Sequence, residues 1–495
     1  TNEIDQTFLP SAVADIGAVL IGPTVKGPAG IPTVVTSFSD FQAKFGDVFK
    51  NGVNGESVQF LTSHAAEEYL KNSDTLTVVR ILDGTFGPAT ALVSTSSTTT
   101  PNAATDAGCA FELETLADGA VLNNASTVAT TNNILTSGSK HNVRYEVSNR
   151  NTNKGSFTLT IRAGNDNIKR KQTLETFTNI NLDPNSVNYV QKVVGDQTLT
   201  IRTDENSKPF LQLSGSYPNK SRFVRVKSVN LKTTDYLDEN GNVRLGDASA
   251  SLPGNGSGSK QGGFAGGTNG IAGFDSLGNI VTSSAGGVAI GSYEFYENIG
   301  LTNSQGFKLV SGADGTNAYV QALDLLANQD EFDVNLILMP GIIDGASGAG
   351  HATVVSKAID VCEDRGDCFA IIDPVIYGKN VGDATGKAEA RDSNFAAMYW
   401  PWVKIPDSQV GGTQRWVPPS TVLGGIYAFN DRVAHPWFAP AGLNRGGITT
   451  AIQAERKLTQ ADRDSLYDSN VNPIATFPGQ GVTVFGQKTL QKKPS

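Results

Sequence analysis

Apolar residues in the first 86 positions recur with spacings that predict alternating strands and helices. Phe38, Phe41 and Phe45 follow Ser37 at helical spacing, and Gly46 is a typical helix stop, so a helix is expected there. A second helix is expected over residues 56–72, where apolar residues again share one face. Runs of β-branched and apolar residues predict strands at 16–21, 33–35 and 75–82.

The same pattern returns from about residue 300 to the C-terminus. A buried strand is expected at 334–339, ended by Pro340 and Gly341, and another at 368–372. The helix predicted at 351–365 lies between them, so these elements form a strand–helix–strand unit of a parallel sheet. Further helices are expected at 317–328 and at 448–469, the second broken near Thr459 by a new N-cap, and a closing strand at 482–485.

The middle of the chain, residues 87–300, is rich in Thr, Ser, Asn and Gly and shows strand-like alternation. Strands are expected at 142–147, 156–162, 197–202 and 222–229. In 156–162, Phe157, Leu159 and Ile161 are expected to face a core, and the polar residues between them to face water. The glycine-rich residues 252–273 predict a long exposed loop.

These three zones predict the fold class. We expect an α/β core that is discontinuous, formed by residues 1–86 and 301–495. A large, mainly-β insertion at residues 87–300, with room for two subdomains, interrupts this core.

Charge and cysteine content exclude several classes of function. The chain has 39 Lys and Arg against 48 Asp and Glu, a net charge of −9, which argues against a broad surface for nucleic acid or anionic lipid. It has no apolar stretch near the ~20 residues that span a bilayer, and no secretory signal at its start. Cys109, Cys362 and Cys368 fit neither a disulfide framework nor a zinc site, so we expect reduced, buried thiols and synthesis in a reducing cytoplasm.

Histidines and polar motifs give no catalytic signature. The four histidines, His64, His141, His351 and His435, occur in no metal-binding spacing. His64 is expected to be packed in a helix, and His435 has the most unusual placement, although a loop histidine bonded to backbone is the simpler interpretation.

Two loops superficially resemble ligand-binding motifs. Residues 254–260 evoke a phosphate-binding loop, but Ser259 separates the last glycine from Lys260, and a flexible loop is the better interpretation. Asp235, Asp238 and Asn240 are loosely calcium-like, yet the ligand series is incomplete and a hairpin turn is expected. We therefore predict no catalytic, cofactor-binding or metal-binding residue, and an enzyme is possible only through a site that these motifs do not reveal.

Large aromatic residues late in the chain are expected to anchor the core. Trp416, Trp437 and Phe438 are the predicted anchors, held by proline-rich loops. Arg445 is expected either against a carboxylate or a helix C-terminus, or in solvent.

Four ordered stretches resemble the bacteriophage contractile tail sheath proteins. Residues 27–38, followed by Phe41 and Phe45-Gly46, resemble the N-terminal part of that family. Residues 176–190 resemble its insertion-domain signature, and residues 311–315 resemble the return to the core. Residues 439–446, then Leu466-Tyr467 and 471–474, resemble its late core block. Each match is weak alone, but the ordered set covers most of the chain.

The resemblance implies a structural protein of the virion, not an enzyme, assembled in the host bacterial cytoplasm. Sheath subunits form six-fold rings stacked as a helix around a tail tube, and contraction drives the tube through the host envelope. The implied partners are other copies, the tail tube protein, the baseplate and the tail terminator, with no direct contact to nucleic acid and no membrane insertion. The β insertion is expected on the outside.

The sequence departs from the family at both ends. Sheath proteins usually have a short arm ahead of the equivalent of residues 2–5, and continue past 489–490 into a domain that exchanges strands. The 495-residue chain alone is therefore expected to stay monomeric or weakly associated. Two alternatives stay open: the sheath of a related contractile injection particle, and a cytosolic α/β enzyme with a β carbohydrate-binding insertion.

Overall fold

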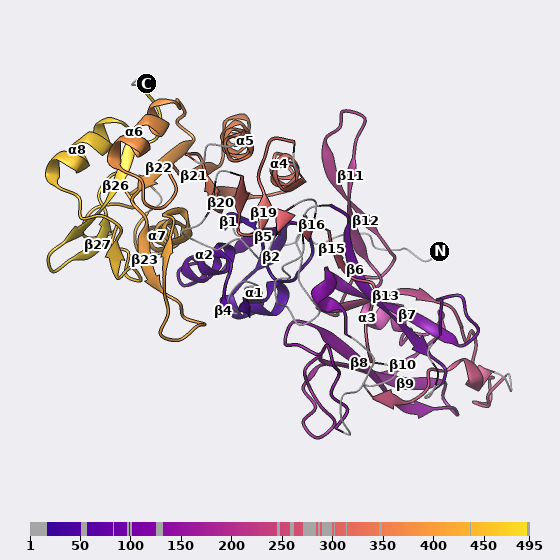
Figure 1. Ribbon diagram of the computed structural model, residues 1–495. Helices are drawn as coiled ribbons and strands as arrows, with labels where there is room; N and C mark the ends of the chain where they lie inside the picture. Colours follow the sequence, from indigo (N-terminus) through magenta and orange to yellow (C-terminus); the bar gives the residue numbers. More distant parts are fainter. Residues whose placement is uncertain are drawn as a thin grey trace.

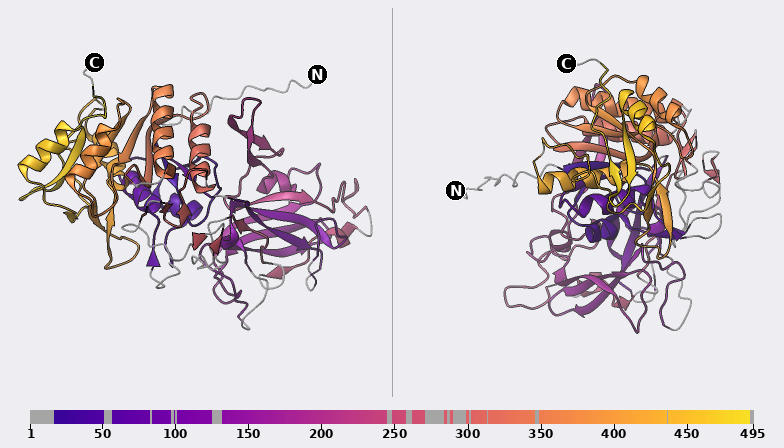
Figure 2. Two further views of the ribbon diagram at one scale, coloured as in Figure 1. Left: turned by 45° about the horizontal axis from the view of Figure 1, so that its top comes forward. Right: turned by 90° about the vertical axis from the view of Figure 1, so that its left-hand side faces the viewer.

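The computed structural model shows a mixed α/β protein (Figure 1). Figure 2 shows its elongated shape from two further directions, with a helix-rich part beside a β-rich part. The structure describes residues 17–50, 57–82, 84–96, 99, 101–124, 132–244, 248–257, 262–270, 284–285, 288–289, 299–300, 302–312, 314–345, 349–435 and 437–492.

The helix-rich part is built on one eight-stranded sheet with the order β2-β5-β1-β20-β21-β22-β26-β27. Its strands are β1 (Gly17–Gly22), β2 (Thr33–Val35), β5 (Leu76–Arg80), β20 (Val334–Ile343), β21 (Phe369–Asp373), β22 (Ala396–Trp400), β26 (Val471–Phe477) and β27 (Gly481–Val484). The central strands are parallel, whereas β2 and β27 pair antiparallel at the two ends. Because Val19 of β1 lies opposite Ile337 of β20, the first and last parts of the chain share this sheet.

Helices cover both faces of the sheet, as Figure 1 shows for α2 and α7 on one side and α4 and α5 on the other. One face packs against α1 (Phe38–Phe45), α2 (Leu61–Leu70) and α7 (Ser420–Val433). The other packs against α4 (Asp314–Leu326), α5 (Ala349–Arg365), α6 (Val381–Glu389) and α8 (Gln460–Asp468). Since both faces are covered, β1 is apolar throughout and every residue in it is buried.

The β-rich part contains two four-stranded sheets. The first has the order β13 (Val224–Val229), β7 (Cys109–Asp118), β6 (Phe86–Ser94) and β15 (Thr268–Asn269). The second has the order β10 (Thr173–Asn181), β9 (Ser156–Ala163), β8 (Val143–Asn151) and β14 (Gly256–Ser257). Phe111 of the first sheet stacks on Phe157 of the second, with ring centroids 5.8 Å apart, so the sheets share a core.

Short elements complete the described structure. The β11 (Thr198–Thr203) and β12 (Pro209–Ser214) hairpin projects from the β-rich part (Figure 1). A three-stranded sheet joins β24 (Gln414–Val417), β23 (Val403–Pro406) and β25 (Gln453–Ala454). The remaining elements are the strand pairs β3 (Phe49–Lys50) with β4 (Ser57–Val58), β16 (Ser284–Ala285) with β17 (Val288–Ala289) and β18 (Asn303–Ser304) with β19 (Phe307–Lys308), the helix α3 (Val190–Val194), and the 3-10 turns at Ala120–Leu122 and Ala248–Ser251.

The helix predicted after Ser37 and the parallel strand–helix–strand unit are confirmed. The Ser37 side chain accepts a hydrogen bond from the Asp40 amide at 3.1 Å, and Gly46 ends α1 with a φ of 77°. Thr459 and Asp462 form the predicted capping box of α8. β20, α5 and β21 follow one another, with the two strands parallel.

Three boundaries differ from the prediction. Pro340 and Gly341 do not end β20, because the register shifts between Leu338 and Ile343 and absorbs them as an irregularity. The helix expected from residue 448 exists only as α8, since Gln453–Ala454 pairs with β23 instead. The helix expected from residue 56 begins at Leu61, because Ser57–Val58 pairs with β3, and Glu56 itself lies outside the described residues.

Two expectations about exposure were wrong. The polar residues of β9 do not face water: Thr158 is 7% exposed and Arg162 is 0% exposed. Arg162 is buried against the carboxylates of Asp166 and Glu146. The glycine-rich stretch 252–273 is not an exposed loop where it is described, because Leu252 and Phe264 are buried and β14 and β15 pair with the sheets. Residues 258–261 and 271–273 of this stretch lie outside the described residues.

Candidate functional site

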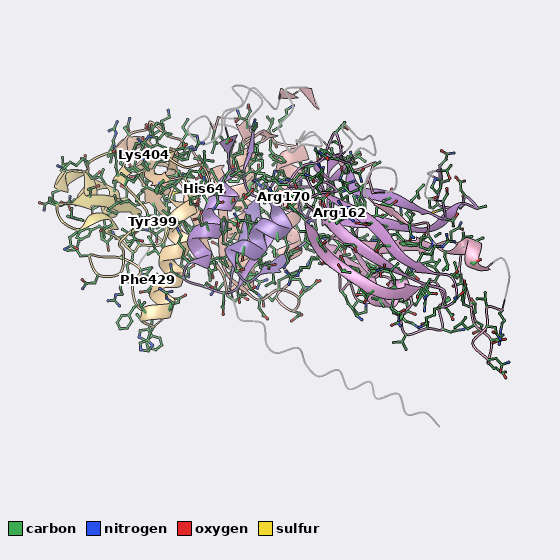
Figure 3. All side chains as sticks on the ribbon, turned by 90° about the horizontal axis from the view of Figure 1, so that it is seen from below. His64, Arg162, Arg170, Tyr399, Lys404 and Phe429 are labelled. Carbon is green, nitrogen blue, oxygen red and sulfur yellow. The ribbon has the colours of Figure 1, made fainter. Side chains whose placement is uncertain are left out.

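Three of the four histidines are buried singly in separate places. His64 on α2, labelled in Figure 3, is 2% exposed, and its Nε2 lies 3.9 Å from a carboxylate oxygen of Asp407. Burial is the main reason that the pKa values of His64, His141 and His351 are lowered to about 4. The packed role predicted for His64 is confirmed. In His351, Nδ1 accepts a hydrogen bond from the Ile343 amide at 3.2 Å.

The predicted burial of the three cysteines is confirmed. Cys109, Cys362 and Cys368 are free and buried, and the Cys362 and Cys368 Sγ atoms lie 3.3 Å apart. Within the described ranges, no group of three or more His, Cys, Asp and Glu side chains could hold a metal ion. Those residues also contain no helix long and apolar enough to cross a bilayer.

The two loops that resemble ligand motifs have structural roles where they are described. In the stretch 254–260, the Gly254 amide donates to the Ser94 carbonyl and Gly256–Ser257 forms β14, whereas residues 258–260 lie outside the described residues. The amides of Asn240 and Asn242 donate to the Asp238 carboxylate, and these hydrogen bonds lower the pKa of Asp238. The hairpin turn predicted here is confirmed.

One buried carboxyl group was missed in the sequence. Asp373, at the end of β21, is 1% exposed and accepts hydrogen bonds from the amide and hydroxyl of Ser420, the first residue of α7. Burial raises the pKa of Asp373 to about 7, and the Ser420 hydrogen bonds oppose this shift only in part. Sequence spacing gives no signal for it, since the partners are 47 residues apart.

Asp373→Asn should remove part of the pH dependence of stability. The folded-state pKa of about 7 lies above the unfolded value of ~4, so the folded state retains a proton between these values. The stabilising contribution is full below pH ~4 and is lost as the pH rises through 7. As the pH rises from 4 to 8, we expect the free energy of unfolding of the variant to rise relative to that of the native chain by on the order of 1–3 kcal/mol. Urea unfolding at each pH measures this difference. Parallel pH profiles would contradict this assignment.

The predicted aromatic anchors are only partly correct. Trp416 packs against the core, but Trp437 is 77% and Phe438 is 40% exposed. They are exposed because they follow the C-terminal end of α7, beyond the sheet. Arg445 lies over the ring of Phe438 at 4.3 Å, not against a carboxylate or in free solvent. The buried anchors are Trp400, the last residue of β22, and Trp402, two residues later, and the sequence analysis missed both.

Trp→Phe substitutions at the buried and at the exposed tryptophan should change the free energy of unfolding by different amounts. Trp402→Phe should lower the free energy of unfolding by about 1–3 kcal/mol, because the Trp402 Nε1 donates to the buried carbonyl of Val375 at 3.0 Å. Trp437→Phe should change it by less than ~0.5 kcal/mol, as expected for a surface site. Denaturant melts of both variants provide the check, and equal losses would contradict the observed exposures.

Exposed apolar side chains gather at three places in the described structure. The β11–β12 hairpin exposes Leu199, Phe210 and Leu213, and a groove of about 870 Å³ lies between this hairpin and residues 28–33. Trp437 and Phe438 form the second place, and Tyr467 and Phe485 form the third. Apolar surface of this kind marks contact sites for other proteins. These three places are therefore candidate contact sites for other proteins.

Comparison with known proteins finds similar sequences among phage tail sheath proteins. Residues 313–490 match the family model of the phage tail sheath protein central domain. The tail sheath protein of Vibrio phage KVP40 is 29% identical over 238 residues, covering 41% of this chain and 35% of that protein. The tail sheath protein of Enterobacteria phage T4 is 30% identical over 213 residues, covering 38% of this chain and 32% of that protein. A sheath tail protein of Listeria innocua aligns with 98% of this chain and 71% of its own, at 11% identity and a TM-score of 0.46.

The matched stretches span about a third of the length of these curated relatives. The family model lies within the last part of the chain, which contains β20 to β27 and the helices α4 to α8. The family resemblance predicted from four ordered stretches is confirmed. Over residues 313–490, this chain is similar to the central domain of phage tail sheath proteins.

Proposed function

We propose that this chain is a structural subunit of a contractile phage tail sheath. Its copies stack as rings around a tail tube and contract to drive the tube through the host envelope. The observation that carries this proposal is the match of residues 313–490 to the sheath central domain, supported by tail sheath relatives at 29% and 30% identity. The exposed apolar sites on the described surface add support, since a sheath subunit must contact other copies.

A sheath role requires contact patches and no catalytic pocket. In this proposal six copies form a ring, and rings stack as a helix through contacts between unlike patches. Packed interfaces switch between discrete arrangements, so the energy released in contraction is held in these contacts. No residue is proposed as catalytic, cofactor-binding or metal-binding.

We further infer that residues 1–86 and 301–495 form the sheath core and that residues 87–300 form an outer β-rich insertion. Support comes from the eight-stranded sheet, which combines β1, β2 and β5 with β20, β21, β22, β26 and β27. The strands from β6 to β15 form sheets of their own.

The partners in this proposal are other copies, the tail tube protein, the baseplate and the tail terminator. The net charge of −9 favours protein partners over direct contact with nucleic acid or insertion into an anionic membrane. The subunit belongs to the virion tail and is assembled in the host bacterial cytoplasm.

Negative-stain microscopy of the full-length protein tests the proposal. Striated tubes are expected, and capsids on the same particles would distinguish a phage tail from a related injection device. Single particles at every concentration, together with a tightly retained nucleotide or sugar, would instead favour an enzyme.

A further inference from the structure

Two of the three cysteines lie against each other where α5 ends and β21 begins. Cys362 is in the last turn of α5, and Cys368 precedes Phe369, the first residue of β21. Their Sγ atoms are 3.3 Å apart and share a hydrogen bond. Both thiols are buried in the core on the face of the sheet that α4 and α5 cover, and Figure 1 shows α5 beside β21.

A tight turn between the two cysteines holds their sulfur atoms close together. The Gly366 amide donates to the Cys362 carbonyl at 2.9 Å, and Gly366 has a φ of 72°, which favours glycine. The guanidinium of Arg365 donates to both carboxylate oxygens of Asp367, at 2.8 Å and 2.9 Å. It also donates to the Leu326 carbonyl at the end of α4, at 2.6 Å. These hydrogen bonds fix the turn without help from the thiols, so the proximity of the sulfur atoms is built into the fold.

The distance between the two sulfur atoms suits the formation of a disulfide bond. A disulfide has an S–S length of ~2.0 Å, so the Sγ atoms of Cys362 and Cys368 must approach each other by about 1.3 Å. Rotation of the two side chains about their Cα–Cβ bonds moves the sulfur atoms by this amount while the turn keeps its hydrogen bonds. The pair can therefore be joined within the observed fold.

Cys368 is the sulfur that an oxidant reaches first. Gly366 and Asp367, directly before it in the chain, are exposed, whereas Cys362 is enclosed within α5. Hydrogen bonding with Cys362 lowers the pKa of the Cys368 thiol, although burial opposes this shift, and the Arg365 guanidinium lowers this pKa further. The same hydrogen bond raises the pKa of Cys362. Because the thiolate is the reactive form of cysteine, oxidation starts at Cys368 and Cys362 acts as the second thiol.

We propose that Cys362 and Cys368 form a reversible disulfide when the chain meets hydrogen peroxide. The Cys368 thiolate attacks the peroxide, so an S–O bond forms, the O–O bond breaks, and the departing hydroxide takes up a proton to become water. Cys368 is then a sulfenic acid. The Cys362 sulfur attacks the Cys368 sulfur, so the S–S bond forms, the S–O bond breaks, and the departing hydroxide leaves as water with the proton of Cys362. Two thiols are oxidised, and one peroxide is reduced to two water molecules.

This modification site is independent of the sheath function. A chain assembled in the bacterial cytoplasm, as proposed above, keeps both thiols reduced there, and the pair is oxidised after the chain leaves that compartment. The disulfide closes the loop of residues 362–368 and ties the end of α5 to β21, a parallel strand of the eight-stranded sheet. Closing this loop makes local opening at this end of α5 rarer.

Mass spectrometry of the full chain after peroxide treatment tests the proposal. Trypsin cleaves after Lys357, Arg365 and Lys379, so Cys362 lies in the peptide 358–365 and Cys368 in the peptide 366–379. The remaining thiols are blocked, and the chain is digested without reductant. We expect the two peptides to be joined, with the loss of two hydrogen atoms. Free thiols titrated in denaturant should fall from three per chain to one, and dithiothreitol should restore all three.

Variants of single cysteines make the result specific. Cys109 is an internal control, because its Sγ donates to the Phe111 carbonyl at 3.6 Å, and it should stay reduced. Cys109→Ser should form the same linked peptides and retain no free thiol after oxidation. Cys362→Ser leaves the sulfenic acid of Cys368 without its second thiol. Dimedone should therefore label the peptide 366–379 in this variant at least ~10-fold more than it labels the peptide 358–365 in Cys368→Ser.

Several outcomes would overturn the proposal. Three free thiols after peroxide treatment would show that the pair is only hydrogen-bonded. Equal oxidation of Cys109, or disulfide-linked dimers on non-reducing gels, would show that oxidation is not specific to the pair. In the oxidised chain, amide hydrogen exchange of residues 360–372 should slow at least ~10-fold, and unchanged exchange would contradict the tie between α5 and β21. None of these measurements requires rings or tubes, so a failure here leaves the sheath function intact, and single particles in micrographs would leave the disulfide intact.

Discussion

Arg80→Met is expected to lower the free energy of unfolding by at least ~4 kcal/mol, because it leaves several buried carbonyl groups without donors. Arg80 is 0% exposed and lies at the end of β5. Its guanidinium donates to the carbonyls of Gly27 at 2.6 Å, Asp118 at 2.8 Å, and Thr24 and Val25 at 3.2 Å. Asp118 ends β7, so one side chain ties the eight-stranded sheet to the β-rich part. Thermal and urea unfolding measure the loss.

Two controls distinguish the loss of hydrogen bonds from a general effect of removing an arginine. Arg80→Lys keeps the positive charge but not the planar set of donors, so it should lose stability by an intermediate amount. Arg170→Met removes an exposed arginine, labelled in Figure 3, and should change stability by less than ~0.5 kcal/mol. A loss for Arg80→Met as small as that for Arg170→Met would show that the observed contacts contribute little.

Local patterns in the sequence identify the elements whose burial is simple. β1 and β20 are long apolar runs because both faces of their sheet are covered, and α1 has a cap, an apolar face and a glycine stop. The sequence analysis did not predict α7, because two glycines interrupt the apolar pattern of this helix. A Cβ at Gly424 would lie 2.6 Å from a Leu338 methyl carbon, and one at Gly425 would lie 2.6 Å from the Glu68 carbonyl oxygen. Both glycines are required because other parts of the chain pack closely against α7. A local sequence pattern does not reveal this packing.

The exposure of individual side chains was harder to predict than the positions of the helices and strands. Tryptophan and phenylalanine are usually buried, so Trp437 and Phe438 were expected in the core, yet they extend beyond the end of α7. Burial of Trp437 depends on which elements surround the loop, and that is a property of the tertiary fold. The hollow beside α8 combines residues from α8 with Phe485, which follows β27, so its existence could not be derived from spacing either.

The polar side of β9 was predicted to face water but is buried in the structure. Alternation predicted that Arg162 faces water, but its guanidinium donates to Asp166 at 2.6 Å and 2.8 Å and to Glu146 at 2.9 Å. Arg144 on β8 donates to the same Asp166 carboxylate at 3.2 Å, and both arginines are 0% exposed. Figure 3 labels Arg162 among the strands of the β-rich part. Alternation distinguishes polar from apolar sides, but it does not show whether opposite charges cover the polar side.

Asp166→Ala should therefore unfold the β-rich part selectively, with a loss of about 4–5 kcal/mol, because it leaves two buried arginines without their shared carboxylate. If residues 87–300 form a separate insertion, the eight-stranded sheet should stay folded. Limited proteolysis at rising temperature, read by mass spectrometry, should find early cleavage within 87–300 and protection within β1, β20 and β21. Glu205→Ala, at an exposed turn of the same part, should leave the cleavage pattern unchanged. Simultaneous cleavage of both parts in Asp166→Ala would show that they unfold as one cooperative unit, and would contradict the proposed division of the chain.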